Sequence, residues 1–452
     1  LVYKHYTENG YWTFVLSRNM LNNEAEKYFR NDDSTEENLI LRYKSQEIEN
    51  KLRAERTLRS GDFKFNYGLG YEFVKYNNRT FNRIFTSSGP QTVDYSSSLD
   101  FHKYNFFGQV SRKLLEERLA LSLGFRADAN SYSEAMSNPL DQFSPRLSLS
   151  YALTDRLAFN FNTGLFYQLP PYTVMGYQEE GQLVNKDNRI RYIRNAQVVA
   201  GLEYNTAANS KISIEAYYKK YANYPFLLRD SLTLANLGGD FGIIGNEPAV
   251  SRSEGRTYGL ELLFQQRLFK GFYGIAAYTL GWSEFEDKAG NFVASSWDAR
   301  HILNLTLGKR FGKNWEVGLI WRYQSGLPFT PFSDASALVL SWNANNGGIR
   351  DFDLLNTLSN SSSNTIDLRI DKKWFFTNWN LNLFLDVENL TSNAVGNFQL
   401  ILDRPLDENG MPLGSGIIIN PDAPLEEQRY QLKEINDATG SLIPTIGLII
   451  EL

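Results

Sequence analysis

The sequence predicts an all-β protein, a transmembrane antiparallel up-and-down β-barrel, and three observations support this prediction. Apolar and polar residues alternate with a period of two along most of the chain, short turns alternate with long polar segments, and aromatic residues cluster beside the short turns. A period of two places successive side chains on opposite faces of a strand. Short turns at one end, long loops at the other and aromatic girdles are typical of transmembrane barrels.

The composition narrows the kind of protein. The chain has 452 residues and no cysteine, which excludes a disulfide framework and a thiolate metal site. Its histidines, His5, His102 and His301, lie far apart, which argues against a histidine metal centre or a histidine-based catalytic relay. The net charge of -5 gives no indication of nucleic-acid binding. No run of about 18 apolar residues predicts a transmembrane helix, but a barrel with alternating faces needs no such run.

Three segments show the alternation most clearly. Aliphatic residues alternate with polar or charged residues in 119–130, 366–371 and 379–388. One face of each predicted strand is therefore aliphatic and the other polar, as expected where one face meets lipid and the other lines a lumen. No convincing 3.6-residue period interrupts the series, so no long helix is predicted.

Short turns and longer polar segments follow one another along the chain. The predicted short turns are Thr7–Gly10, Arg59–Asp62, Leu115–Arg118, Leu153–Arg156, Asn205–Lys211, Phe269–Gly271, Phe311–Asn314 and Phe376–Trp379. The predicted long segments are roughly 31–37, 86–98, 133–142, 168–194, 230–251, 287–296, 329–362 and 391–440. Each pair of short turns brackets one outgoing and one returning strand, which gives about sixteen complete strands with antiparallel neighbours. A soluble sandwich has no reason to keep its short turns on one side, whereas an outer-membrane barrel keeps them in the periplasm.

The sequence starts inside a predicted strand. Residues 1–6 precede a turn at Asn9-Gly10, a pair that suits a tight hairpin. Six extended residues span about 20 Å, whereas a tilted strand needs about 9–11 residues to cross a bilayer. We therefore expect further strands to precede residue 1 in the complete protein. Segments such as 37–58 and 61–85 are longer than a crossing requires, and we expect their polar outer halves to project into water.

Aromatic residues near the short turns support a membrane interface. The aromatic residues around two of these turns are Phe311, Trp315, Trp374, Phe375, Phe376 and Trp379. Amphipathic rings prefer the depth of the lipid head groups, so this placement predicts an interfacial girdle. Packing at the ends of a soluble sandwich is the alternative, but it leaves the aliphatic faces between the girdles without a partner.

The end of the chain carries a further signal. Thr445, Gly447, Ile450 and Leu452 are similar to the closing strand of outer-membrane barrels, which the barrel assembly machinery reads. Leu452 stands where such strands usually have an aromatic residue. The alternative is an ordinary edge strand.

Several stretches, in order and spread over most of 100–452, resemble the barrel of TonB-dependent outer-membrane receptors. They are "SPRLSLSYALTDRLAFNFNTGLFYQLPP" (144–171), "RSEGRTYGLELLFQQRLFKGFYGIAAYTLGWS" (252–283), "WDARHILNLTLGKRF" (297–311) and "LRIDKKWFFTNWNLNLFLDVENLTS" (368–392). The last strand, with Pro444, resembles members from Bacteroidetes-type bacteria.

This resemblance implies the rest of the architecture. Barrels of the family have twenty-two strands, preceded by an N-terminal plug and a TonB-binding box. We expect residues 1–452 to form one receptor β-barrel domain that lacks the plug, the box and the first strands, so no plug or box residue is assigned.

Charged residues recur on the predicted lumen face. The candidates for contact with the plug or the solute path are Arg126, Asp128, Arg300, Arg322, Asp367, Arg369, Asp371, Asp386 and Glu388. A solvated polar wall with weak cross-strand pairs explains any single residue equally well.

The long segments supply candidate ligand residues. These are Tyr167, Tyr172, Tyr177, Arg189, Arg191 and Tyr192 around 168–194, and Trp342, Asn343, Asn345 and Asn346 in 329–362. Aromatic rings with Asn and Arg suit sugars, peptides or ferric chelates, although exposed loop ends carry such residues without a ligand. The acidic segment 31–38 is a candidate Ca²⁺ site, but an acidic loop in water explains it better. No other metal site and no cofactor is predicted.

The leading functional prediction is TonB-dependent active import of a scarce solute, such as a ferric siderophore, an oligosaccharide or a peptide, across the bacterial outer membrane. A passive sixteen-stranded porin is the alternative, and a barrel enzyme or adhesin comes third. Motifs for catalysis are absent from the sequence, so we expect no enzyme. The expected partners are the TonB-ExbB-ExbD complex, outer-membrane lipid and lipopolysaccharide, and the barrel assembly machinery. A surface lipoprotein lid is a further candidate.

Overall fold

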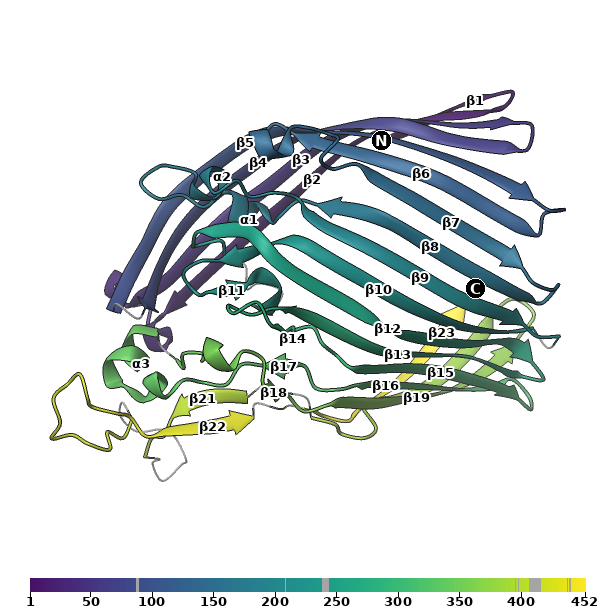
Figure 1. Cartoon of the computed structure of the whole chain (residues 1–452). Helices are drawn as coiled ribbons and strands as arrows, with labels where there is room; N and C mark the ends of the chain where they lie inside the picture. Colours follow the sequence, from purple (N-terminus) through teal and green to yellow (C-terminus); the bar gives the residue numbers. More distant parts are fainter. Residues whose placement is uncertain are drawn as a thin grey trace.

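The computed structural model describes residues 1–86, 89–207, 209–237, 244–345, 347–394, 396, 398–405, 416–436, 438 and 440–452. These residues form one large, curved antiparallel sheet with loops gathered at one end (Figure 1). The sheet has nineteen strands, of which β11 and β14 are short branches, so seventeen strands form the wall. This agrees with the predicted sixteen strands and the partial strand before them.

Each wall strand pairs with its neighbours along the chain. The wall strands are β1 (Val2–Thr7), β2 (Gly10–Tyr28), β3 (Leu39–Ser60), β4 (Phe63–Thr86), β5 (Gly89–Leu114), β6 (Leu119–Asn130), β7 (Ser144–Ala152), β8 (Leu157–Gln168), β9 (Ile193–Asn205), β10 (Ser210–Leu227), β12 (Ala249–Phe269), β13 (Phe272–Glu286), β15 (His301–Phe311), β16 (Trp315–Gln324), β19 (Ser363–Phe375), β20 (Asn380–Glu388) and β23 (Ile443–Glu451).

The remaining elements lie in the connections. They are η1 (Phe29–Asn31), η2 (Glu36–Asn38), η3 (Glu134–Met136), α1 (Tyr172–Met175), α2 (Val184–Asp187), β11 (Leu232–Thr233), η4 (Leu234–Asn236), β14 (Phe292–Ala294), β17 (Pro328–Phe329), η5 (Asp334–Ala337), α3 (Val339–Asn345), η6 (Phe352–Leu354), β18 (Leu358–Ser359), β21 (Phe398–Leu402) and β22 (Leu432–Asn436). No helix in the described part of the chain is long and apolar enough to cross a membrane.

All eight predicted short turns are confirmed, and they gather at one end of the wall, opposite the long loops (Figure 1). One predicted long segment is wrong. Residues 86–98 were expected to form a loop, but β4 extends to Thr86 and β5 begins at Gly89, and the two strands pair along this length. In paired strands, cross-strand hydrogen bonds satisfy the backbone N–H and C=O groups of a polar segment, just as water satisfies them in a loop.

The register assigns every wall residue to one of two faces. Residues directly opposite each other in an antiparallel pair point to the same side. Tyr76 and Phe101 face the loops inside the curve and are buried by them, so the residues in register with them form the inner face. The opposite, outer face carries exposed aliphatic side chains such as Leu69 and Leu262.

The sheet is a partial barrel. β1 pairs with β2 alone and β23 pairs with β20 alone, and no pairing joins β1 to β23 within the described ranges.

The residues of the predicted closing signal lie on both faces of the last strand. Thr445 and Gly447 lie opposite Asp386 and Phe384 on the inner face of β20, whereas Ile450 lies on the outer face. A Cβ at Gly447 would lie 2.1 Å from the Phe384 ring, so only glycine lets this ring lie flat against β23. Leu452 follows β23 and is exposed. The proposed reading of these residues by an assembly factor stays a prediction.

Candidate ligand site at the outer mouth of the barrel

Three loops fold back against the inner face of the wall. They join β6 to β7, β8 to β9 and β10 to β12, and α1, α2 and β11 lie in them on the concave side of the sheet (Figure 1). Their apolar side chains pack with inner-face residues of β4 and β5 in one group, which we call the loop cluster. Its buried members are Val74, Tyr76, Leu99, Phe101, Tyr132, Met136, Tyr172, Val174, Met175, Ile190, Tyr192, Leu227, Leu232, Leu234 and Ala249.

The loop after β8 enters the cluster because its sequence ends the strand abruptly. Pro170 and Pro171 cannot donate a ladder hydrogen bond, so β8 stops at Gln168 and α1 follows directly. Tyr172 in α1 packs edge-on against Phe101, with 5.7 Å between ring centroids. Buried aromatic pairs of this kind stabilise a cluster beyond their buried area.

Buried polar groups fix the loops to one another. Asn185 is fully buried, and its Nδ2 donates to Val174 O at 2.7 Å while its Oδ1 accepts from Ala249 N at 2.6 Å. Asn130 Nδ2 donates to Tyr192 Oη at 2.9 Å. The bond to Val174 joins two parts of the loop after β8, and the other two bonds join that loop to wall strands, so together they hold the outer mouth in a defined shape.

A charged anchor ties α1 to the wall. Tyr172 Oη donates to Glu49 Oε1 at 2.5 Å, and the same carboxylate lies 2.9 Å from Lys103 Nζ and 2.5 Å from Lys51 Nζ. These three charged residues were not predicted from the sequence. They lie on the inner face of β3 and β5, where every second residue points inward. Only the strand pairing shows which residues these are.

Four of the predicted ligand residues line one pocket of about 460 Å³, which we call the rim pocket. They are Tyr167, Arg189, Arg191 and Tyr192. The loop between β6 and β7 supplies the other side of the pocket, including Glu134 and Asp141, which were not predicted from the sequence. Two guanidinium groups and two carboxylates in one pocket can bind a polar ligand through directional hydrogen bonds.

A second pocket of about 600 Å³, the aromatic pocket, lies on the inner face beside the loop cluster and also includes Tyr167. Its lining contains Tyr221, Tyr224, Phe285 and Trp297. The Tyr224 and Phe285 ring centroids are 4.8 Å apart. Phe285 lies flat against Gly255 of β12, where a Cβ would come within 2.3 Å of the ring. Rings held in this way offer flat surfaces for stacking or apolar contact with a ligand.

The structure places the other predicted ligand residues elsewhere. Tyr172 is only 9% exposed and Tyr177 only 5%, because both pack inside the loop layer. The Tyr177 ring meets Tyr95 edge-on at 5.4 Å, and its hydroxyl donates to Glu179 Oε1 at 2.7 Å. Burial raises the pKa of Tyr177 well above its usual range. These contacts indicate a packing role for both tyrosines.

The candidates in 329–362 belong to a separate group. Trp342 is buried with Val339, Leu402 and Tyr430. Asn343 is exposed, and its Oδ1 accepts a hydrogen bond of 3.4 Å from Tyr430 Oη. Residues 346 and 238–243, which belong to two of the predicted loops, lie outside the described residues.

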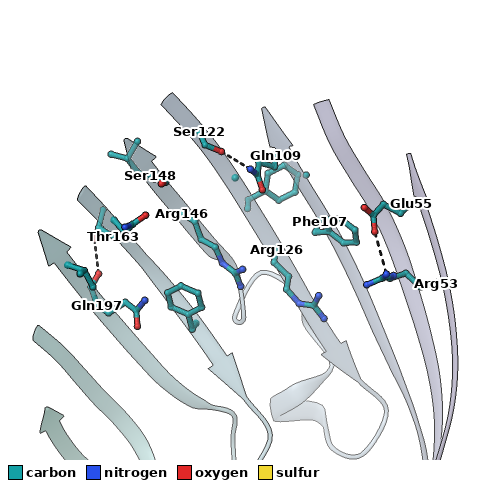
Figure 2. A pocket seen from close by; sticks show the side chains of 17 residues that line it. Arg53, Glu55, Phe107, Gln109, Ser122, Arg126, Arg146, Ser148, Thr163 and Gln197 are labelled. Carbon is teal, nitrogen blue, oxygen red and sulfur yellow. Dashed lines mark hydrogen bonds and ion pairs between the residues drawn. The ribbon is translucent and has the colours of Figure 1, made fainter. Parts of the chain in front are cut away.

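Below the mouth, a shallow basin of about 620 Å³ lies on the inner wall (Figure 2). Figure 2 shows Arg53 of β3, Arg126 of β6 and Arg146 of β7 directed into it. Arg126 forms an ion pair of 2.7 Å with Asp128, and Arg146 lies 4.4 Å from the centre of the Phe166 ring. The basin therefore carries more guanidinium than carboxylate groups.

The other inner-face charges form pairs within the wall. Arg322 lies 2.8 Å from Asp367, while Arg369 lies 2.9 Å from Asp371 and 3.4 Å from Asp386. Glu388 lies two residues beyond Asp386 on the same strand and face. The Arg322–Asp367 and Arg369–Asp386 contacts match the cross-strand pairing that was the alternative to a functional role, whereas the Arg369–Asp371 contact lies within β19.

The predicted direction of the Arg300 side chain is wrong. It was predicted to face the lumen, but its guanidinium lies 4.9 Å from the centre of the Trp282 ring. Trp282 is in register with Tyr258 on the outer face, opposite to the face of Glu261. Arg300 precedes β15, so strand alternation does not fix its direction, and stacking on an aromatic ring turns it outward.

The acidic side chains of segment 31–38 do not come together at one site. Asp32 Oδ1 accepts a hydrogen bond from Ser34 N, and Glu36 forms a pair of 3.0 Å with Arg42. The bond from Ser34 lowers the pKa of Asp32, and the bond from Arg42 lowers that of Glu36. Over the described ranges, no group of three or more His, Asp or Glu side chains could hold a metal ion.

Comparison with known families decides the assignment of the wall. Residues 1–390 match the model described as "TonB dependent receptor-like, beta-barrel". The chain belongs to this family. Its wall therefore spans the bacterial outer membrane, with the short turns at the periplasmic end and the loop cluster at the outer end. No significant sequence match was found among curated proteins.

Solved structures with the receptor-barrel fold are similar to this chain. The ferric yersiniabactin uptake receptor FyuA from Yersinia pestis has 11% identity and a TM-score of 0.60, over 99% of this chain and 60% of FyuA. The copper transporter OprC has 16% identity and a TM-score of 0.60, over 87% of this chain and 60% of OprC. The outer membrane transporter YddB from Escherichia coli has 10% identity and a TM-score of 0.59, over 99% and 61%.

The receptor barrel described here thus spans about three fifths of the length of these structures. At such identities the likeness concerns the fold. Loops vary more among related proteins than the strands that they connect, so the ligand must be inferred from this chain's own pockets.

Proposed function

We propose that the complete protein is a TonB-dependent importer that takes up a scarce solute across the outer membrane. Membership of the receptor family supports this proposal, and several similar structures are named as transporters or uptake receptors for copper or ferric chelates. The outer membrane has no ATP supply, so energy must come from the inner membrane. We propose the TonB-ExbB-ExbD complex as the direct partner, acting on a plug domain.

The observation that carries the proposal is the pair of pockets at the outer mouth. The rim pocket and the aromatic pocket share Tyr167, and buried hydrogen bonds fix the loops that line them. A preformed site loses less conformational entropy on binding than a set of free loops, which suits the capture of a scarce ligand.

The lining favours a ligand with an apolar or aromatic part and polar groups. Tyr221, Tyr224 and Phe285 suit stacking, whereas Arg189 and Arg191 suit anionic or hydroxyl groups. A ferric siderophore, an oligosaccharide or a peptide meets this description. We propose that residues 1–452 act as one barrel domain and need no resident cofactor, and that a surface lipoprotein and the barrel assembly machinery are further partners.

Uptake by the full-length protein tests the proposal. The gene is deleted in its host, and uptake of ⁵⁵Fe-siderophores and labelled oligosaccharides is measured after complementation, with and without dissipation of the proton gradient. We expect energy-dependent uptake of one ligand. The double variant Arg189→Ala/Arg191→Ala should weaken its binding about tenfold or more, because hydrogen bonds to charged groups contribute about 1.5–3 kcal/mol each.

The control variant is Gln182→Ala, which changes an exposed residue of the same loop outside both pockets. It should bind as the unchanged protein does. Single-channel recordings of the full-length protein provide the opposing outcome. A large, steady conductance that needs no energy would contradict the importer and favour the passive porin.

A further inference from the structure

The outer face of the wall carries an apolar groove that none of the lumen functions uses. The groove has a volume of about 560 Å³ and crosses β6 to β10. Its outward lining includes Leu147, Leu165, Ala196, Val198, Tyr218 and Lys220. The small side chain of Ala196 leaves the hollow, and Tyr218 and Lys220 close one end of it.

Strand length places this end at the outer boundary of the membrane. Lys220 lies ten residues from Ser210, where β10 leaves the periplasmic turn. Ten residues span about 33 Å along a strand, or about 25 Å in height at the usual tilt of about 40°. This height matches the apolar band of an outer-membrane barrel. Lys220 therefore lies at the depth of the head groups with Ala196 directly opposite it, and the groove extends from this boundary to Leu147 at the depth of the acyl chains.

An aromatic row continues from the groove at the same level. Tyr218 stacks on Tyr258 with 6.3 Å between centroids, and Tyr258 stacks on Trp282 at 5.2 Å. The residues two positions closer to the membrane on β12 and β13 are Leu260 and Leu280, which are aliphatic. The row thus marks the transition from acyl chains to head groups, where amphipathic rings are most stable.

Basic side chains lie directly above the aromatic row. The charged residues at this level are the basic Arg194, Lys220, Arg252, Arg256 and Arg300 and the acidic Glu254, Glu284, Glu286 and Asp298. Lys220 pairs with Glu254 at 2.9 Å and Arg256 with Glu284 at 2.6 Å. Across the described residues, Arg194 and Arg252 form no ion pair, so the patch keeps an excess of positive charge over its carboxylates.

We propose that this outer-face patch binds a phosphorylated lipid of the outer leaflet. One acyl chain lies in the groove over Ala196 and Val198, and a head-group phosphate accepts hydrogen bonds from Lys220 and Arg194, with Arg256 nearby. Two observations agree on this occupant: the hollow is apolar at acyl-chain depth, and the charge excess at head-group depth is positive. The proposal depends on the membrane orientation of the wall and is independent of which solute is imported.

Lipid binding to the detergent-purified full-length protein tests the proposal. Native mass spectrometry measures binding of diphosphoryl lipid A and of its dephosphorylated form. We expect the unchanged protein to prefer the phosphorylated lipid about tenfold or more. The variants Arg194→Gln and Lys220→Gln/Arg256→Gln should lose most of this preference, and Ala196→Trp, which fills the groove, should weaken binding of both lipids.

The matched control is Lys309→Gln. Lys309 also lies on the outer face over an aromatic ring, 3.4 Å from the centre of Phe272, but at the periplasmic end of the wall. It should leave the preference unchanged, and heat-modifiable gel mobility confirms that each variant is folded. Arg194→Gln changes an exposed, unpaired side chain, so it serves if the double variant does not fold.

Three outcomes would overturn the proposal. The first is equal binding of the two lipids by the unchanged protein. The second is an equal loss of preference in Lys309→Gln. The third is displacement of the lipid by millimolar inorganic phosphate, because this would show a site for a free anion and no contribution from the groove.

Discussion

The two halves of the β4–β5 hairpin bury opposite faces of the same strands. In the half near the short turns, the outer face is apolar and exposed, as Leu69 and Phe106 show, with 59% and 52% exposure. In the half near the loops, the inner face is apolar, and Tyr76 and Phe101 are 0% and 2% exposed. The side on which apolar residues stand therefore changes within each strand.

The surroundings of each half explain this change. The lower half has lipid outside, so apolar side chains point outward. The upper half has water outside, where Arg79 pairs with Asp94 at 2.8 Å, and the loop cluster inside. The upper half follows the rule of a soluble protein, in which apolar groups leave water by packing against other parts of the same chain.

Removing a large side chain from the loop cluster should give the largest effect. Phe101→Ala should destabilise the cluster by about 3–5 kcal/mol, the usual cost of truncating a buried aromatic residue. Hydrogen exchange in residues 172–192 should accelerate strongly while exchange in the lower strands stays slow. The control is Phe106→Ala on the outer face of the same strand. If both variants changed the loops equally, the two halves would not be independent.

A charge placed on the outer face of β4 should affect the two halves of the β4–β5 hairpin differently. Leu69 lies six residues above the start of β4, near the middle of the apolar band, so Leu69→Arg should cost about 2–4 kcal/mol. Asn77→Arg, eight residues further along the same face, should change stability by about 0.5 kcal/mol or less because it meets water. Urea titration of folding into lipid vesicles measures both. If both variants lost the same amount of stability, the membrane boundary would lie above Asn77.

A smaller effect should appear as a pH dependence of the outer loops. Burial, with Asp230 beside it, raises the pKa of Glu247 from 4.5 to about 7, and Arg229 opposes this shift. Because the folded pKa is higher than the unfolded one, the stabilisation is complete below about pH 4.5 and is lost as the pH rises through 7. The protection factors of amide hydrogens around Arg229 and Glu247, from which the intrinsic pH dependence of exchange is divided out, should therefore fall modestly between pH 5.5 and 8.

The variant Glu247→Gln provides the control for this pH dependence. Glutamine keeps an oxygen that can accept the hydrogen bonds of Arg229 N and Asp230 N, which are 3.0 and 3.1 Å long. It cannot ionise, so the protection factors should no longer change over this pH range. The same dependence in both proteins would assign the effect to another group.

The candidate site was only partly predictable. The sequence identified the loop 168–194, and Tyr167, Arg189 and Arg191 do line a pocket. Tyr172 and Tyr177 look the same in the sequence but are buried, because whether a loop tyrosine meets solvent depends on the segments that fold over it. Arg300 points outward because a ring on a neighbouring strand attracts it, and no local pattern contains that ring.

The sequence by itself determined the strands, their order and all eight short turns, because a period of two and turn-forming residues act between near neighbours. The tertiary structure decided the rest. It determined that 86–98 is paired strand, that apolar residues change face along β4 and β5, and which loop residues share a pocket. The physical reason is that burial depends on what lies opposite a residue in space, and in this barrel the loops, the lumen and the lipid each supply a different neighbour.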